Sequence, residues 1–385
     1  MSEIKVNSIK GVGASAAAIT VNNTDGTCTA NITSLNGGQF SNRNLIINGA
    51  MQVAQRGTSD SGVTQSGYTV LDRYKVGGSS FGTITVSQST DSPDGFANSY
   101  KVDVTTANGS LSAGSLLEIQ QSLEGQDVQA FAKGTSAAKQ YSLSFYVKST
   151  KTGTYVAMLQ DHDNSRMCCK TYTVSNTNWN RYTLTYPADT TGAFGNDNQK
   201  SLSVKFCLVA GTTFTSGTLQ TTWGTAANAT SRVGQVNFAD STSNDWYVTG
   251  VQLEVGSVAT DFEHRSFGQE LALCQRYFQT ISEKGGAGHT MGCGMNQSSS
   301  TAHLTLPFHC TMRTTPSLDQ LTGTNYYVLY SNGGTEEFDS WNLDTSVITP
   351  ERAELNKTGI SITQGSGNLC RYNNVNAEIR FSAEL

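Results

Sequence analysis

Short runs in which apolar and polar residues alternate recur between turn signals from about residue 44 to residue 263. In the run 141–147 every second residue is apolar, so one face of the strand is apolar, because successive strand side chains point to opposite sides. The runs with this character are 68–76, 83–86, 100–104, 141–147, 155–159, 181–186, 202–208 and 246–253. The pattern predicts one antiparallel β-sandwich with long loops.

The segment 266–279 has the periodicity of a helix instead. Ser266 can cap its N-terminus, with Gln269 at the capping-box position. Leu271, Cys274 and Phe278 then fall on one apolar stripe. A helix between two β regions is expected to be a linker that packs on both.

Strand character returns after the Gly-rich loop 282–288. The clearest runs are 302–306, 326–330, 359–363 and 377–383. They predict a second, smaller β-sandwich over residues 282–385.

The first 44 residues are too polar and Gly-rich to form a core alone. Two short strands, 18–21 and 27–32, flank a turn at 22–26 and predict a hairpin. A lone hairpin is marginal in water, so this one should be stable only when paired with copies of itself or docked on another protein. The predicted organisation is therefore mainly β: an N-terminal hairpin stalk (1–44), a central sandwich (45–263), a linker helix (264–281) and a C-terminal sandwich (282–385).

Composition narrows the class of partner. Charged residues make up 14% of the chain, about half of the usual share. The net charge is −5 and the basic residues are scattered, which argues against nucleic acid and anionic membranes as partners. We see neither a signal peptide nor an apolar run near the roughly 20 residues needed to cross a bilayer, so we expect a soluble protein made in a cytoplasm.

Eight cysteines are present and none forms a CxxC pair, which argues against a zinc knuckle or a redox motif. Cys168 and Cys169 are adjacent and would point to opposite faces of a strand. We expect free thiols packed as small apolar side chains.

The densest ionisable cluster is Asp161-His162-Asp163, directly after a predicted strand. It could be an acid/base group or half of a metal site, but a solvated hairpin loop is the favoured interpretation. A glycosidase would need two carboxylates flanking the scissile bond, and the sequence contains no second cluster at a known spacing. Catalysis is therefore not expected.

Sugar recognition needs an aromatic face for stacking and amides or carboxylates for hydroxyl groups. The carbohydrate-binding candidates are Asp161, His162, Asp163, Trp223, Tyr326, Tyr327 and Trp341, although ordinary packing is the favoured interpretation for each aromatic residue. Trp179 is expected in the core instead. His303 and His309 could be ligands, although such residues are more often packed or on the surface.

Several ordered stretches resemble one family. The opening Asn44–Gly57 with Tyr68–Tyr74, and the close Trp246–Gly256 followed by 259–265 and 270–277, resemble segments of bacteriophage tail-fibre and other virion structural proteins. The beginning, 4–9 with 18–21, is similar to the short N-terminal segments of such proteins in phages of cyanobacteria and other marine bacteria.

The resemblance implies a galactose-binding-like jelly roll in the centre, similar to carbohydrate-binding modules, and a homotrimer attached to other tail proteins through residues 1–44. It implies host surface polysaccharide or lipopolysaccharide as a partner and the phage tail as the location. Related modules often hold a structural calcium, but Thr249-Gly250 and Ala50 stand where acidic residues would help. Glu254 and backbone carbonyls could still contribute, and no other cofactor is expected.

The leading hypothesis is therefore a non-enzymatic homotrimeric tail fibre. One alternative is a purely architectural tail, baseplate or head-decoration protein. A second is a tailspike depolymerase.

Overall fold

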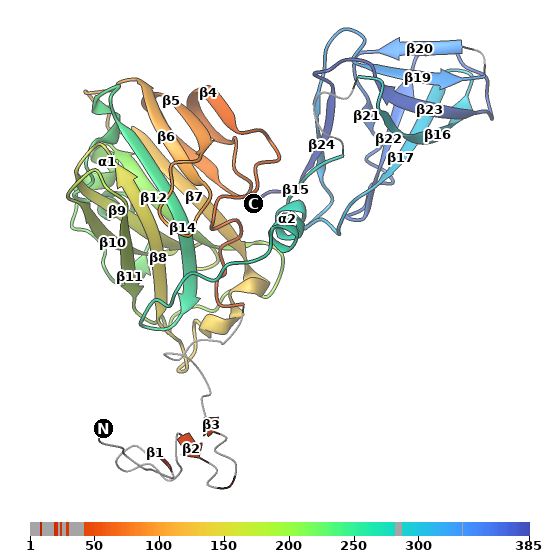
Figure 1. Cartoon of the computed structure of the whole chain (residues 1–385). Helices are drawn as coiled ribbons and strands as arrows, with labels where there is room; N and C mark the ends of the chain where they lie inside the picture. The colour runs from red at the N-terminus through yellow and green to blue at the C-terminus, as the bar shows by residue number, and fades with distance from the viewer. Residues whose placement is uncertain are drawn as a thin grey trace.

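The computed structural model describes residues 8–9, 19–21, 24, 28–30, 42–281, 287–332 and 334–385. Strands account for 46% of the structure and helices for 7%, which confirms the mainly β prediction. Figure 1 shows a large curled sandwich, a smaller one beside it, and short strands near the N-terminus.

The large sandwich is a single antiparallel sheet that curls on itself. Among the described residues its order is β11-β8-β14-β6-β5-β7-β12-β9-β10-β13, and β4 pairs with β5. Its strands are β4 (Ser59–Tyr68), β5 (Lys75–Ser89), β6 (Ser99–Thr106), β7 (Leu116–Glu124), β8 (Tyr141–Ser149), β9 (Gly153–Asp161), β10 (Arg166–Val174), β11 (Asn180–Tyr186), β12 (Lys200–Ala210), β13 (Gly224–Thr225) and β14 (Asp245–Val255). Single-turn 3-10 helices lie at Gly125–Asp127, Gln129–Phe131, Asn228–Thr230 and Phe238–Asp240.

The long strand β5 joins the two layers of this sandwich. Its first part pairs with β7 and its second part with β6. The first part needs Gly78 where it pairs with β7, because its φ is +107° and an added Cβ would lie 1.9 Å from the carbonyl oxygen of Leu116. Apolar residues of both layers then face one core.

The strand predicted at 141–147 is confirmed, and its four apolar side chains are fully buried. The strand predicted at 68–76 is wrong in its middle, because residues 69–74 form a turn between β4 and β5. Arg73 has a φ of 73° there and its buried guanidinium pairs with Glu384. That distant contact holds the turn.

A second apolar cluster covers the outer side of β9, β10 and β12. Met158, Cys169 and Cys207 pack there against Phe214, which belongs to the short helix α1 (Thr212–Thr215). Cys168 instead faces the main core, so the prediction of opposite faces is confirmed. The seven cysteines whose side chains are described are all free thiols, as expected.

The predicted linker helix is present as α2 (Phe267–Gln275), and the Ser266 hydroxyl accepts a hydrogen bond from the Gln269 N–H at 3.4 Å. It ends earlier than expected, because Phe278 belongs to strand β15 (Phe278–Thr280), which pairs with β24. In the described part of the chain, no helix is long and apolar enough to cross a membrane.

The C-terminal sandwich has two antiparallel sheets around one core. Within the described residues they have the orders β20-β19-β23-β16-β17-β22-β21 and β15-β24-β18. The strands are β16 (Thr290–Ser298), β17 (Thr301–Pro307), β18 (Ser317–Leu321), β19 (Tyr327–Ser331), β20 (Gly334–Phe338), β21 (Asn342–Leu343), β22 (Arg352–Thr358), β23 (Gly367–Tyr372) and β24 (Glu378–Ser382). The strand predicted at 359–363 is wrong: this segment is irregular, although Ile360 and Ile362 are buried in the core.

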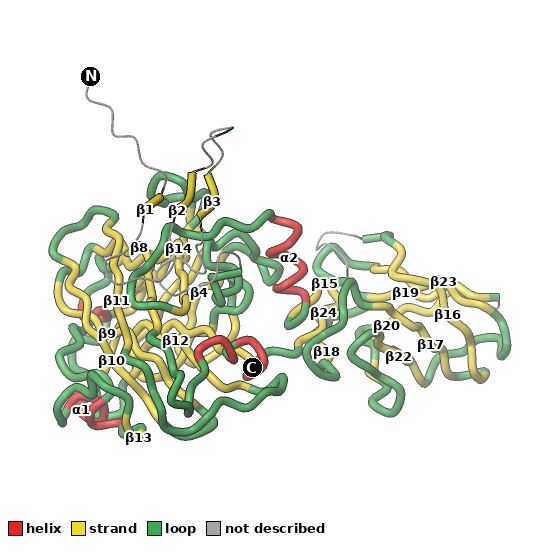
Figure 2. The backbone as a smooth tube through the Cα atoms, turned by 90° about the horizontal axis from the view of Figure 1, so that it is seen from below, coloured by secondary structure: helices red, strands yellow, loops and turns green. Residues whose placement is uncertain are grey.

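Helix α2 lies between the two sandwiches (Figure 2). Polar groups and a small apolar cluster join the two sandwiches beside it. The buried carboxylate of Glu124 accepts hydrogen bonds from the Arg276 guanidinium at 2.8 and 2.7 Å and from the Tyr277 hydroxyl at 2.5 Å. The Tyr68 hydroxyl donates to the carbonyl oxygen of Leu385 at 2.7 Å. The end of the chain is therefore attached to the central sandwich.

Near the N-terminus, β2 (Ile19–Val21) pairs with β1 (Ser8–Ile9) and with β3 (Cys28–Ala30). The β2–β3 pair confirms the predicted hairpin. The remaining positions predicted there, including 18, 27 and 31–32, lie outside the described residues.

Candidate functional site

Two aromatic rings lie on the outward side of the layer β11-β8-β14-β6. Tyr247 on β14 stands directly opposite Lys148 on β8 and Lys101 on β6. The two ammonium groups lie 5.4 and 5.6 Å from the centre of its ring. The Trp179 ring meets Tyr247 edge to face, with centres 6.1 Å apart. We call Trp179, Tyr247, Lys101 and Lys148 the aromatic face.

Carboxylates border the aromatic face. Lys148 pairs with Asp91 at 2.6 Å, and the Trp179 indole N–H donates to the same carboxylate at 3.0 Å. Burial acts to raise the pKa of Asp91, but the hydrogen bonds from Lys148 and Trp179 outweigh it and hold that pKa below its ordinary value. Lys101 pairs with Asp245 at 2.9 Å. The rings are thus bordered by ammonium donors and carboxylate acceptors.

This arrangement suits a ligand that is flat, weakly apolar on one side and rich in hydroxyl groups. The half-exposed indole of Trp179 offers a stacking surface. Lysine ammonium groups donate hydrogen bonds and aspartate oxygens accept them, so both can bind hydroxyl groups. A pyranose ring has these properties.

A pocket of about 250 Å³ opens on the other layer, beside α1. Glu118 lies at its base and is held by Arg232 and by Lys205, the latter at 3.0 Å. Burial acts to raise the pKa of Glu118, but Arg232 and Lys205 lower it to about 2. Gln160 and Phe214 also line this outer pocket. The Arg232 guanidinium lies 5.2 Å from the centre of the Phe214 ring and the described lining contains no tryptophan or tyrosine, so this pocket is a weaker candidate than the aromatic face.

A larger cavity of about 660 Å³ lies at the junction of the two sandwiches. Its polar lining is largely engaged: the Gln55 side chain donates to Asp72 and to the carbonyl oxygen of Phe278, and Arg56 pairs with Glu384. These contacts hold the two sandwiches together.

Asp161 is the last residue of strand β9, and His162 and Asp163 lie in the β9–β10 hairpin loop. Asp161 is fully buried and pairs with Lys133 at 2.7 Å. The His162 Nε2 lies 2.8 Å from the Ser203 hydroxyl, and burial, with help from Lys200 and Lys205, lowers the pKa of His162 to about 4. Asp163 is exposed and accepts a hydrogen bond from the Gly195 N–H at 2.9 Å. The expectation of a solvated loop therefore fails for Asp161.

The two tryptophans of the central sandwich have different surroundings. Trp223, a candidate platform for which packing was favoured, packs against the main core, where its indole N–H donates to the Pro187 carbonyl at 2.8 Å and its ring lies 5.6 Å from Tyr141. Trp179, predicted in the core, is half-exposed and contacts Tyr247 and Asp91. The core placement of Trp179 was wrong.

The three C-terminal candidates do not form a shared surface. Tyr327 and Trp341 are 0% and 2% exposed and pack with Phe338 in the core. Burial of their apolar ring surface stabilises the fold and leaves neither ring accessible to a ligand. Tyr326 is half-buried in the loop before β19. Tyr330, which follows on β19, is 41% exposed.

The residues near the expected calcium position do not fit that ion. Both carboxylate oxygens of Glu254 accept hydrogen bonds, from the Thr260 N–H and hydroxyl at 2.8 Å each and from Gln252 at 2.9 Å. The side-chain oxygen of Asn48 is bonded to two backbone N–H groups. Calcium needs six to eight free oxygen ligands, and these oxygens are engaged.

No family model matches the chain. No curated protein matches it either. Among solved structures, the chain is similar to the CBM22-1 xylan-binding domain from Paenibacillus barcinonensis Xyn10C, with 11% identity over 59% of this chain and 100% of that one and a TM-score of 0.29. It is also similar to the C-terminal family 22 carbohydrate-binding module of Clostridium thermocellum Xyn10B (14%, 53% and 98%, TM-score 0.28) and to a family 11 module from Clostridium thermocellum (10%, 54% and 98%, TM-score 0.27). TM-scores of this size do not establish a shared fold, and nothing about function rests on them.

Proposed function

We propose that this chain is a non-enzymatic subunit of a bacteriophage tail fibre whose central sandwich binds host surface glycans through the aromatic face. The observation that carries glycan binding is the half-exposed Trp179 ring beside Tyr247, bordered by the pairs that Lys148 and Lys101 form with aspartates. Such a site needs no cofactor. Weak sites of this kind gain strength when several copies act together.

The tail role is supported by the segments that resemble tail-fibre proteins. The opening and closing segments of that resemblance also contact each other, as expected if together they bracket one domain. The Leu45 N–H donates to the Leu253 carbonyl at 3.0 Å, and the Asn44 amide donates to the Val251 carbonyl at 3.0 Å. We further propose a homotrimer made in the host cytoplasm, located in the virion tail and attached to other tail proteins through residues 1–44. Its glycan partner is host polysaccharide or lipopolysaccharide.

The test of glycan binding uses the full-length chain on an array of bacterial lipopolysaccharides and capsular polysaccharides. We expect Trp179→Ala to weaken binding about tenfold or more, because the stacking surface is lost. Tyr330→Ala, which removes an exposed ring of the C-terminal sandwich, should leave binding unchanged. Equal glycan binding by wild type and Trp179→Ala would contradict a site at the aromatic face. Loss of glycan binding in Gln160→Ala instead would indicate that the outer pocket is the site.

Absence of binding to any glycan would favour the purely architectural alternative. Release of reducing sugar from host polysaccharide would contradict the non-enzymatic role and favour a depolymerase. Light scattering tests the trimer: we expect three times the 41.1 kDa of one chain. A monomer would refute self-assembly.

A further inference from the structure

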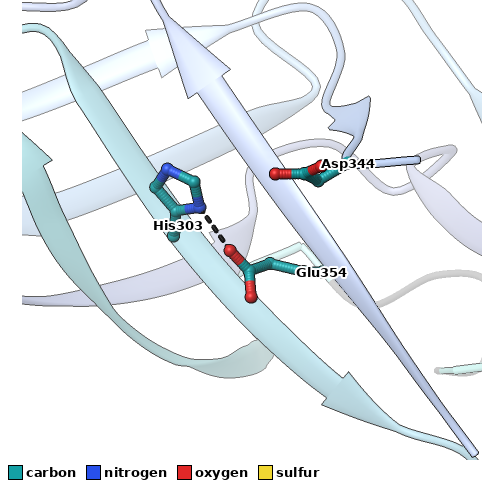
Figure 3. Close-up of side chains that lie close together, drawn as sticks. All are labelled: His303, Asp344 and Glu354. Carbon is teal, nitrogen blue, oxygen red and sulfur yellow. Dashed lines mark hydrogen bonds and ion pairs between the residues drawn. The ribbon is translucent and has the colours of Figure 1, made fainter. Parts of the chain in front are cut away.

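Three side chains with metal-binding atoms project from neighbouring strands at one edge of the C-terminal sandwich (Figure 3). His303 lies on β17, Glu354 on the adjacent β22, and Asp344 directly follows β21, which pairs with β22. Leu304 and Leu355 point into the core from the same strands, so the alternating side chains His303 and Glu354 point outward.

The ligand atoms of these residues already lie together. One atom from each of His303, Asp344 and Glu354 lies within 4.8 Å of the others, and the His303 Nδ1 is 2.5 Å from a Glu354 oxygen. Zinc binds nitrogen and oxygen ligands at about 2.0–2.2 Å, so two ligands of one tetrahedral ion lie about 3.4 Å apart. Small side-chain rotations therefore bring all three atoms to ligand distance.

A hydrogen bond on the far side of the imidazole orients it for this task. The His303 Nε2 lies 2.9 Å from the side-chain oxygen of Gln297. An amide oxygen only accepts, so Nε2 carries a proton and donates it. Metal-binding histidines almost always donate their other ring N–H to an acceptor in this way, which directs the remaining nitrogen to the ion. Here that nitrogen is Nδ1, whose present hydrogen bond to the Glu354 carboxylate holds a proton that metal binding would displace.

The carboxylates also lack the usual cationic partner. Among the ion pairs of the described residues, neither Asp344 nor Glu354 pairs with a lysine or an arginine, and the partner of Glu354 is His303 itself. Asp344 accepts hydrogen bonds from the Ser346 N–H and hydroxyl through a single oxygen, Oδ1. A cation between the three groups would offset this negative charge.

We propose that His303, Asp344 and Glu354 form a binding site for a divalent transition metal ion of the zinc class. One imidazole and two carboxylates suit zinc, cobalt or nickel better than calcium or magnesium, which prefer oxygen ligands alone. Three protein ligands leave at least one position for water or for a group from another molecule. The ion would join the loop after β21 to β17 and β22.

The test treats the full-length chain with a chelator and then titrates it with zinc chloride in a calorimeter. We expect one ion per chain, at least 100-fold weaker binding in His303→Ala, and unchanged binding in His309→Ala, which removes an exposed histidine outside the cluster. Gln297→Ala, which leaves all three ligands in place, should weaken binding about 10- to 100-fold.

Cobalt chloride provides a second readout. The visible absorption of bound Co²⁺ should indicate four or five ligands in the wild type and disappear in Asp344→Asn, while circular dichroism without metal stays the same in both proteins. Zinc binding that is equal in wild type and His303→Ala, or a chain that binds no zinc, would overturn the proposal. Neither result depends on whether the aromatic face binds glycans.

Discussion

Lys133→Met should destabilise the central sandwich strongly, because it leaves a buried carboxylate without its partner. The Lys133 ammonium is fully buried and lies 2.7 Å from Asp161 and 3.2 Å from Asp189, with the Thr191 and Gly192 carbonyls at 2.8 and 2.6 Å. Methionine keeps most of the side-chain volume, so the main effect is electrostatic. Removing one partner of a buried ion pair costs about 3–5 kcal/mol.

For a sandwich of this size, each kcal/mol lowers the melting temperature by about 2–4 °C, so the expected loss is about 6–20 °C. Urea unfolding followed by fluorescence measures the free energy directly. The control is Lys151→Met, which breaks the exposed pair with Asp240 and should cost less than about 1 kcal/mol. Adding Asp161→Asn to Lys133→Met should recover part of the loss, because it neutralises the isolated carboxylate. A single variant as stable as wild type, or no recovery in the double variant, would refute this reasoning.

Three further predictions concern pH, backbone and the junction. The pKa of His162 is about 4 when folded against 6.5 when unfolded, so its stability contribution is complete above pH 6.5 and is lost as pH falls to about 4. Between pH 7 and pH 4.5, the wild type should therefore lose up to about 3 kcal/mol more of its free energy of unfolding than His162→Gln does. Urea unfolding of both proteins at the two pH values measures this difference. Gly78→Ala should lower the melting temperature much more than Gly62→Ala, since both have positive φ but only Gly78 would clash, with the carbonyl of Leu116; equal shifts would contradict this. Glu124→Ala should destabilise the chain by about 1–3 kcal/mol, because it leaves the Tyr277 hydroxyl and the partly exposed Arg276 without their acceptor. It should also make the sandwiches unfold in separate calorimetric transitions, and a single unchanged transition would contradict it.

The alternation of apolar residues was enough to predict most strands, because burial of one face selects that pattern in any sandwich. It failed where a distant contact decides the backbone. The turn at 69–74 depends on the pair between Arg73 and Glu384, which are 311 positions apart. Helix α2 ends before Phe278 because that residue pairs with Ser382 on β24. Local sequence contains neither partner, so both errors follow from tertiary contacts that override local preference.

The candidate sites were harder to predict for the same reason. Trp179 and Trp223 both lie among polar residues in the sequence. The indole of Trp179 donates to Asp91, which is 88 positions away, whereas Trp223 packs against the main core. One signal could have been found: Tyr247 alternates with the buried Trp246 and Val248 in the predicted strand 246–253, and Lys148 directly follows the inward-pointing Val147 at the end of the predicted strand 141–147. Both side chains must therefore face away from the core. Their meeting with Lys101 required the pairing order of β8, β14 and β6, which no local pattern contains. Alternation can therefore indicate which side chains a sheet presents to solvent, whereas strand order decides which of them form a site.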